Sequence, residues 1–148
     1  MSERSEEQLI DVFFDGAAGG NPGSAGAGLY INFGDGKEER KSFSLGMLSN
    51  NHEAEFAALL LALNYCLEHS YLSVSFRTDS QLVNQAIDKR FVKKAIYADY
   101  LVRSLELIDR FDLFFCKWIP DEKNKNADRL AKLAIRNSPK KPGNKGAR

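Results

Sequence analysis

The sequence contains no long apolar run and very little cysteine. No run approaches the roughly 20 apolar residues that a membrane-spanning helix needs. Cys66 and Cys116 are the two cysteines, and they lack the spacing of metal ligands, so we expect reduced thiols rather than a disulfide. Residues 1–8 are polar and acidic, unlike a signal or transit peptide. These absences predict a cytoplasmic protein with no membrane partner.

The chain has 148 residues, of which 43% are hydrophobic, as expected of one soluble globular domain. Its net charge is +1, but the charged residues are distributed unevenly along the chain. Residues 1–122 carry 12 basic and 19 acidic side chains, whereas residues 123–148 carry nine basic and one acidic. A basic end on an acidic body fits either a polyanionic partner or a solubilising, disordered tail. Composition leaves both interpretations open.

The hydrophobic pattern predicts five strands and four helices in the order β-β-β-α-β-α-α-β-α. The strands are expected at residues 12–15, 25–33, 37–46, 72–78 and 112–119, and the helices at residues 52–68, 80–88, 94–109 and 127–135. Four glycines and Pro22 predict a turn over residues 16–23, and Pro120 is expected to begin a charged loop. The small residues 25–28 indicate close packing by another element. The helix over residues 52–68 is apolar nearly all round, which is typical of a buried helix.

Four acidic residues stand at the ends of strands or in the first turns of helices: Asp15, Glu55, Asp79 and Asp128. Each alone is equally compatible with a solvated carboxylate, and Asp128 with a favourable charge in a helix's first turn. If the fold brings them together, their mutual repulsion raises their pKa values unless cations neutralise them. Oxygen ligands in this number suit Mg²⁺ or Mn²⁺, and a site with two such ions performs phosphoryl transfer. The four residues therefore favour a metal-dependent nuclease.

The neighbouring residues strengthen this interpretation. In order along the chain they read DGAAGGNPG from Asp15, NHEAEF from Asn51, TDSQLV from Thr78 and NKNADRLA from Asn124. This set of motifs, spread over residues 9–137, resembles the type 1 ribonuclease H family, which cleaves the RNA strand of RNA–DNA hybrids. The resemblance implies a ribonuclease H-like α/β fold, with a mixed five-stranded sheet and helices on both faces. It also implies a catalytic domain over residues 9–137, and we expect a monomer. The flanking residues 1–8 and 138–148 are expected to be disordered, the latter because of their Pro, Lys and Gly content.

The resemblance assigns roles to the four carboxylates. Asp15 would bridge two Mg²⁺ ions, for which Mn²⁺ is a possible substitute, while Glu55 and Asp79 would hold one ion and Asp128 would help to hold the other. The products would carry 5′-phosphate and 3′-hydroxyl ends. Glu53 is the rival of Glu55, but two residues apart on a helix point to different sides, and Glu55 matches the motif. No serine or cysteine is expected to act as a covalent nucleophile.

The expected substrate contacts rest on the same resemblance. Gly16 lies in a glycine-rich stretch whose amides can approach an RNA backbone. Asn21, Asn51 and Gln81 match positions that contact the minor groove of the hybrid, including the 2′-hydroxyls that distinguish RNA from DNA. Without the resemblance the structural interpretations are favoured: Asn21 as a turn residue, Asn51 as a helix cap and Gln81 as a solvated side chain. The basic run that comprises Lys89, Arg90, Lys93 and Lys94 surrounds Phe91 and suits phosphates plus stacking, or alternatively forms a solvated loop around one buried phenylalanine.

Three features depart from the family pattern and predict weaker binding of the substrate and slower turnover. His52 replaces an Asn or Gln, the loop before Asp128 has no histidine, and Asn50 replaces a threonine that holds a DNA phosphate in some relatives. The loop is similar to that of short archaeal-type members, which often have arginine where this chain has Asp121. Two other functions compete: a binding protein that keeps the fold but cuts weakly or not at all, and a proofreading-type exonuclease. The exonuclease motif Asp-x-Glu is absent at Asp15.

Overall fold

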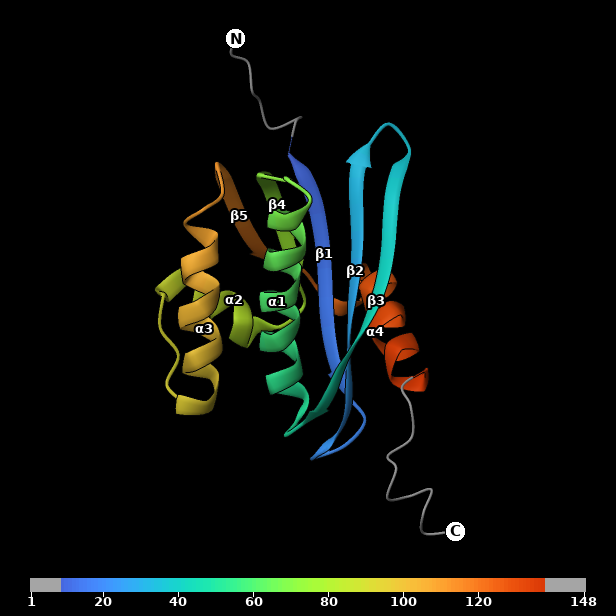
Figure 1. The fold of residues 1–148 in the computed structure, drawn as a ribbon, viewed down its shortest axis with the longest axis vertical. Coiled ribbons are helices and arrows are strands. Elements are labelled where there is room, and N and C mark those ends of the chain that lie inside the picture. The colour runs from blue at the N-terminus through green and yellow to red at the C-terminus, as the bar shows by residue number, and fades with distance from the viewer. Residues whose placement is uncertain (1–8, 138–148) are drawn as a thin grey trace.

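The computed structural model describes residues 9–137, which form one sheet of five strands together with four α-helices (Figure 1). The expectations for residues 1–8 and 138–148 lie outside the described residues. The strands are β1 (Ile10–Ala18), β2 (Gly23–Gly34), β3 (Lys37–Leu48), β4 (Ser73–Thr78) and β5 (Leu113–Trp118), and the helices are α1 (Asn51–Glu68), α2 (Gln81–Lys89), α3 (Ala95–Ile108) and α4 (Lys125–Arg136). The predicted order of elements is confirmed.

The sheet is mixed and has the strand order β3-β2-β1-β4-β5. Strands β1, β2 and β3 form an antiparallel meander, because the turn Asp35-Gly36 and the glycine-rich turn after Ala18 are short. Strand β4 then pairs with β1, and β5 pairs with β4, both in the parallel sense. Helices make the crossovers that parallel strands require. This arrangement confirms the predicted mixed five-stranded sheet.

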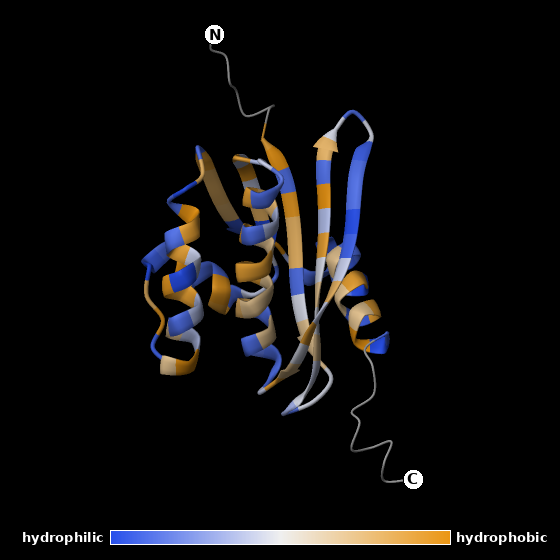
Figure 2. Ribbon diagram, viewed as in Figure 1, coloured by the Kyte–Doolittle hydropathy of each residue, from blue (hydrophilic) through white to orange (hydrophobic). Residues whose placement is uncertain are grey.

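Helices cover both faces of the sheet. Helix α1 packs on β1 and β2 and is covered in turn by α3, whereas α4 packs on the opposite face against β2, β1 and β3. The two-sided burial of α1 explains why its sequence is apolar nearly all round, with Phe56, Leu59 and Leu63 fully buried. Hydrophobic colouring accordingly runs along much of α1 and of the neighbouring strand β1 (Figure 2). None of the helices in the described range is long and apolar enough to span a membrane.

The small residues of β2 allow α4 to approach the sheet closely, as the sequence predicts. A Cβ atom on Gly28 would overlap the carbonyl oxygen of Ala127, and one on Gly26 would overlap that of Ala131. The hydroxyl of Ser42 in β3 also donates a hydrogen bond to the carbonyl of Leu130 at 2.8 Å. Close contact between α4 and β2 therefore fixes where the first turn of α4 lies.

Several predicted boundaries differ from the structure. The turn expected over residues 16–23 is shorter, because Gly16, Ala17 and Ala18 continue β1 and Gly23 already begins β2. Gly16 is needed for close packing rather than for turning, a distinction that depends on tertiary structure. The loop after Pro120 contains a short 3₁₀ helix, Asp121–Lys123, and α4 begins at Lys125, two residues earlier than expected.

Candidate active site

Parallel pairing of β1 with β4 brings Asp15 and Asp79 to the same edge of the sheet. The last registered pair is Phe13 with Arg77, and each aspartate follows two residues after its member of this pair, which favours the same face for both. Asp79 comes directly after β4. Asp15 was predicted to end its strand as well, but β1 continues to Ala18 and pairs there with β2 alone. Asp15 is therefore held by backbone hydrogen bonds on one side and open toward β4 on the other.

Helix α1 carries Glu55 to this edge of the sheet. The backbone of Gly16 lies against the Ala54 carbonyl, which only glycine permits at that distance. The Oε1 atom of Glu55 accepts a hydrogen bond of 2.9 Å from the hydroxyl of Ser80, and the Nδ1 atom of His52 lies 3.2 Å from the same oxygen. Ser80 is buried and caps α2 by accepting from the Val83 amide. Glu55 is thus oriented by a residue that is itself fixed.

Helix α4 brings Asp128 from the opposite face of the sheet. Asp128 lies in the first turn of the helix, where an acidic residue is favoured by the exposed amides. Its Oδ2 atom forms an ion pair with the Nζ atom of Lys132, one turn later, at 3.1 Å. Its carboxyl group lies close enough to that of Asp15 to raise the pKa of Asp15. Asp128 and Asp15 therefore meet across the edge of the sheet.

All four carboxylates line one open cleft with a volume of about 680 Å³. The other charged residues around the cleft are Asp121, Glu122, Lys125 and Lys132, none of which was among the predicted site residues. Lys132 could have been inferred, because residues four apart on a helix are neighbours and Asp128 was already a candidate. Asp121 and Glu122 could not have been inferred in this way, because no helical spacing relates the 3₁₀ segment to the four carboxylates.

The crowding of carboxylates changes their acidity. The pKa of Asp15 is raised from 3.8 to about 9, chiefly by burial and then by the charge of Asp79. The neighbouring Asp128, which favours the protonated form of Asp15, and the charge of Glu55 act in the same direction. Burial also raises the pKa of Asp79, with Glu55 among the charges that add to the effect. Raised pKa values of grouped carboxylates indicate a site that favours positive charge.

The donor set fits a hard divalent cation. Every candidate ligand is a carboxylate oxygen, and a bound cation would relieve the repulsion that raises the pKa of Asp15. Within residues 9–137, no three Asp, Glu, His or Cys side chains converge tightly enough to enclose an ion by themselves. A loosely grouped set of carboxylates can still hold an ion that keeps several waters and also binds substrate phosphates.

Glu53 lies away from the cleft. Its Oε1 atom accepts a hydrogen bond from the Ser49 amide at 2.8 Å, and its Oε2 atom accepts one from the Tyr100 hydroxyl at 2.7 Å. The Glu53 amide donates to the Asn50 side chain at 2.9 Å. This reciprocal arrangement resembles a capping box at the start of α1. The Glu53 carboxylate is therefore occupied by hydrogen bonds near the start of α1, whereas Glu55 lines the cleft.

The expected substrate residues occupy different surroundings. Gly16 is buried and lines the cleft, and Asn51 lines it too, accepting a hydrogen bond from the Ala18 amide at 2.9 Å. Asn50 rather than Asn51 caps α1, contrary to the simple structural interpretation of Asn51. Asn21 is exposed in the turn before β2, and Gln81 is exposed at the start of α2 beside Asp79. Of these four residues, Gly16 and Asn51 line the cleft.

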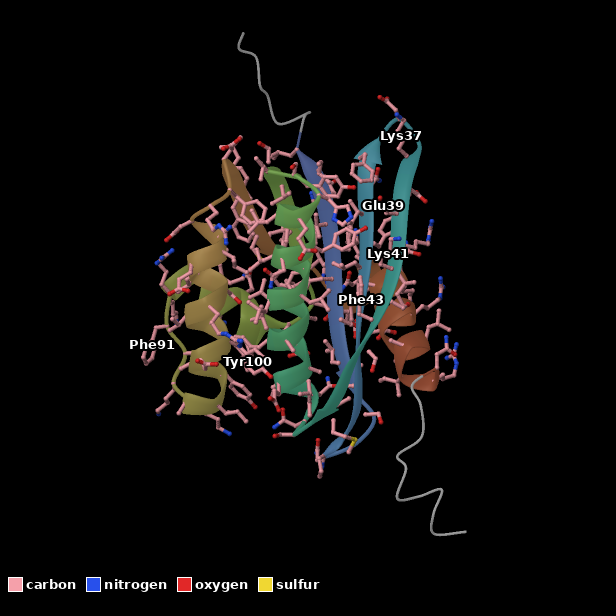
Figure 3. All side chains as sticks on the ribbon, in the orientation of Figure 1. Lys37, Glu39, Lys41, Phe43, Phe91 and Tyr100 are labelled. Atoms are coloured by element: carbon pink, nitrogen blue, oxygen red, sulfur yellow. The ribbon has the colours of Figure 1, made fainter. Side chains whose placement is uncertain are left out.

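The basic run lies apart from the cleft, in the connection between α2 and α3. Lys89, Phe91 and Lys93 line a separate shallow pocket of about 180 Å³, and Arg90 forms a long, exposed ion pair of 3.7 Å with Asp109. The alternative in which Phe91 is buried is wrong, because 65% of this side chain is exposed. Figure 3 shows Phe91 projecting outward on the side of the molecule away from β3. Four cations and an exposed ring therefore form a second polar surface.

A 3-2-1-4-5 mixed sheet with helices on both faces and acidic residues at the β1–β4 edge is the ribonuclease H-like fold. The family model described as "Reverse transcriptase-like" matches residues 13–134. The chain therefore belongs to this family of ribonuclease H-like domains.

Individual relatives agree with this assignment. EbsB of Enterococcus faecalis, which is named as a hydrolase only provisionally, is 35% identical over 129 residues, covering 86% of this chain and 94% of EbsB. The crystal structure of ribonuclease H1 from Halobacterium salinarum is 30% identical with a TM-score of 0.82, covering 88% and 99% of the two chains. LC11-RNase H1, isolated from compost by a metagenomic approach, was solved in complex with an RNA/DNA hybrid; it is 30% identical with a TM-score of 0.76, covering 86% and 96%.

Proposed function

We propose that this protein is a metal-dependent endoribonuclease that hydrolyses the RNA strand of RNA–DNA hybrids, leaving 5′-phosphate and 3′-hydroxyl ends. The observation that carries the proposal is the cleft in which Asp15, Glu55, Asp79 and Asp128 gather from four elements. A protein that only binds nucleic acid gains nothing from burying Asp15 among like charges, because carboxylates repel phosphates. The similarity to a relative solved with an RNA/DNA hybrid supports the choice of substrate.

The chain's own residues have distinct parts in this reaction. Asp15, Glu55, Asp79 and Asp128 would hold two Mg²⁺ ions, or Mn²⁺ in their place. When bound, such ions lower the pKa of a water and neutralise charge on the phosphate in an in-line displacement. Ser80 orients Glu55 through its hydrogen bond of 2.9 Å. Gly16, Asn21, Asn51 and Gln81 would bind the minor groove and its 2′-hydroxyls, and Lys89, Arg90, Lys93 and Lys94 would bind phosphates of the hybrid.

The test is cleavage of an end-labelled RNA–DNA hybrid with and without Mg²⁺, beside duplex DNA and duplex RNA of the same sequence. We expect Mg²⁺-dependent cleavage within the RNA strand of the hybrid alone, and a need for several consecutive ribonucleotides. Mn²⁺ should substitute for Mg²⁺. Efficient cleavage of duplex DNA would overturn the substrate assignment. Tight binding of the hybrid without any cleavage in either metal would instead support the alternative of a binding protein.

A further inference from the structure

Asn124 is a fully buried polar residue at the point where the 3₁₀ segment turns into α4. Only 1% of its surface is exposed. A buried primary amide is costly unless its polar atoms are hydrogen-bonded, so its partners indicate why it is there. It directly precedes α4, the helix that carries Asp128.

The side chain of Asn124 is tied to the strand that carries Asp15. Nδ2 donates a hydrogen bond of 3.1 Å to the carbonyl oxygen of Phe14, which is the residue before Asp15. The same side chain lies close to Asp79 and lowers the pKa of that carboxyl group against the raising effect of burial.

The backbone of Asn124 reaches α4. Its carbonyl oxygen accepts a hydrogen bond of 3.1 Å from the Asp128 amide, and this bond opens the first turn of α4. One residue is thereby hydrogen-bonded both to the peptide before Asp15 and to the Asp128 backbone, and it lies close enough to Asp79 to lower the pKa of that carboxyl group.

The other side-chain atom, Oδ1, has no hydrogen-bond partner among the described residues. Rotating the amide by 180° would not help, because Oδ1 would then face the Phe14 carbonyl, which is itself an acceptor. The hydrogen bond from Nδ2 to this carbonyl therefore determines the orientation of the amide, and it leaves Oδ1 unsatisfied. A residue kept only for packing would not need this arrangement.

We propose that Asn124 is a positioning residue that fixes the separation of Asp15, Asp79 and Asp128 and so prepares them to bind divalent cations. The inference rests on the proposed function, since it concerns the cations of the same site. It adds a residue that touches no substrate and acts through the ligands. Hydrogen-bond partners of ligand groups elsewhere affect metal affinity by about 10- to 100-fold.

The test uses Asn124→Ala with Ser104→Ala as the matched control. Ser104 is also fully buried with an unpartnered oxygen among the described residues, but it lies in α3, away from the cleft. Mn²⁺ binding is measured by calorimetry without substrate, and kcat and KM are measured on a hybrid. We expect Asn124→Ala to weaken Mn²⁺ binding by about 10- to 100-fold and to lower kcat with KM nearly unchanged. Ser104→Ala should leave both unaltered.

Mn²⁺ affinity equal to that of the wild type in a folded Asn124→Ala variant would overturn the inference. If that variant does not fold, the side-chain amide of Asn124 in the wild-type protein is followed by NMR during Mg²⁺ titration. Its resonances should shift, and unshifted resonances at saturating Mg²⁺ would also overturn the inference. A wild-type protein that binds Mn²⁺ in an Asn124-dependent way but leaves the hybrid uncut would refute the proposed function alone.

Discussion

Gly16 in β1 lies directly against the carbonyl group of Ala54 in α1, so close that a side chain at residue 16 has no room. This contact links the residue after Asp15 to the residue before Glu55. The distance between two candidate metal ligands from different elements is therefore set by the absence of a single Cβ atom. Flexibility of the glycine is not the reason for its presence, because Gly16 lies within a regular strand.

Gly16→Ala should consequently both destabilise the protein and impair the site. The added methyl group must push α1 away from β1, and overpacking of this kind costs about 1–3 kcal/mol of unfolding free energy, or more where backbone must move. We expect a lower urea midpoint and a lower kcat. Gly19→Ala is the matched control, because a Cβ atom there would meet its nearest neighbour, the Ser24 carbonyl oxygen, at an ordinary 3.5 Å. Equal stability and activity in both variants would contradict this account of Gly16.

Asp15 makes the stability of the protein dependent on pH. In the folded chain its pKa is raised to about 9, whereas its ordinary value is 3.8. Between these values the folded state binds a proton that the unfolded state has lost, so stability in the absence of divalent cations should fall as the pH rises through this window. Asp15→Asn should abolish hybrid cleavage while flattening this pH dependence. Urea denaturation with a chelator at several pH values measures it, and added Mg²⁺ should stabilise the wild type far more than the variant. A wild type whose stability does not change across the window would contradict the assignment.

The fold was predictable because its signals are local. Apolar periodicity and turn residues identify each strand and helix, and the small residues 25–28 even predict that something packs closely on β2. What the sequence could not provide are features set by tertiary contacts. Gly16 was assigned to a turn because glycine favours turns, whereas its packing against Ala54 depends on the path of α1. Asn50 and Asn51 are equally good caps by residue type, and only the position of the first helical turn decides between them.

The residues of the site could be predicted only in part, because tertiary contacts also decide which residues surround the cleft. The four acidic candidates were recognised from the residues around them, and the structure places them around one cleft. Asp121 and Glu122 lie beside them only because the connection from β5 to α4 passes the edge of the sheet. Asn124 was visible as part of a motif, but its burial and its contact with the Phe14 carbonyl could not be read from residue type.

Substitutions of Glu53 and Glu55 test which of these two glutamates serves the reaction and which stabilises the protein. Glu55→Gln should remove a candidate metal ligand, abolishing cleavage with little loss of stability. Glu53→Gln should weaken the hydrogen bonds to the Ser49 amide and the Tyr100 hydroxyl, at a cost of about 1 kcal/mol, and should retain activity. Thermal unfolding and initial rates on the hybrid measure the two effects. The opposite pattern, with Glu53→Gln inactive and Glu55→Gln active, would reverse the assignment.

The connection between α2 and α3 should contribute to binding and not to the chemical step. Lys93 is exposed beside the exposed ring of Phe91, so Lys93→Ala should raise KM for the hybrid with kcat little changed. If the ammonium group contacts a phosphate, the slope of log affinity against log salt concentration should fall by up to about 0.9 in magnitude. Lys41→Ala is the matched control, because Lys41 is an exposed lysine of β3 that lies on the other side of the molecule from Phe91 (Figure 3). Hybrid binding measured over a range of salt concentrations distinguishes the two lysines. An identical salt slope in the wild type and in Lys93→Ala would mean that this lysine is only a solvated surface charge, and that the grip on the substrate lies closer to the carboxylate cleft.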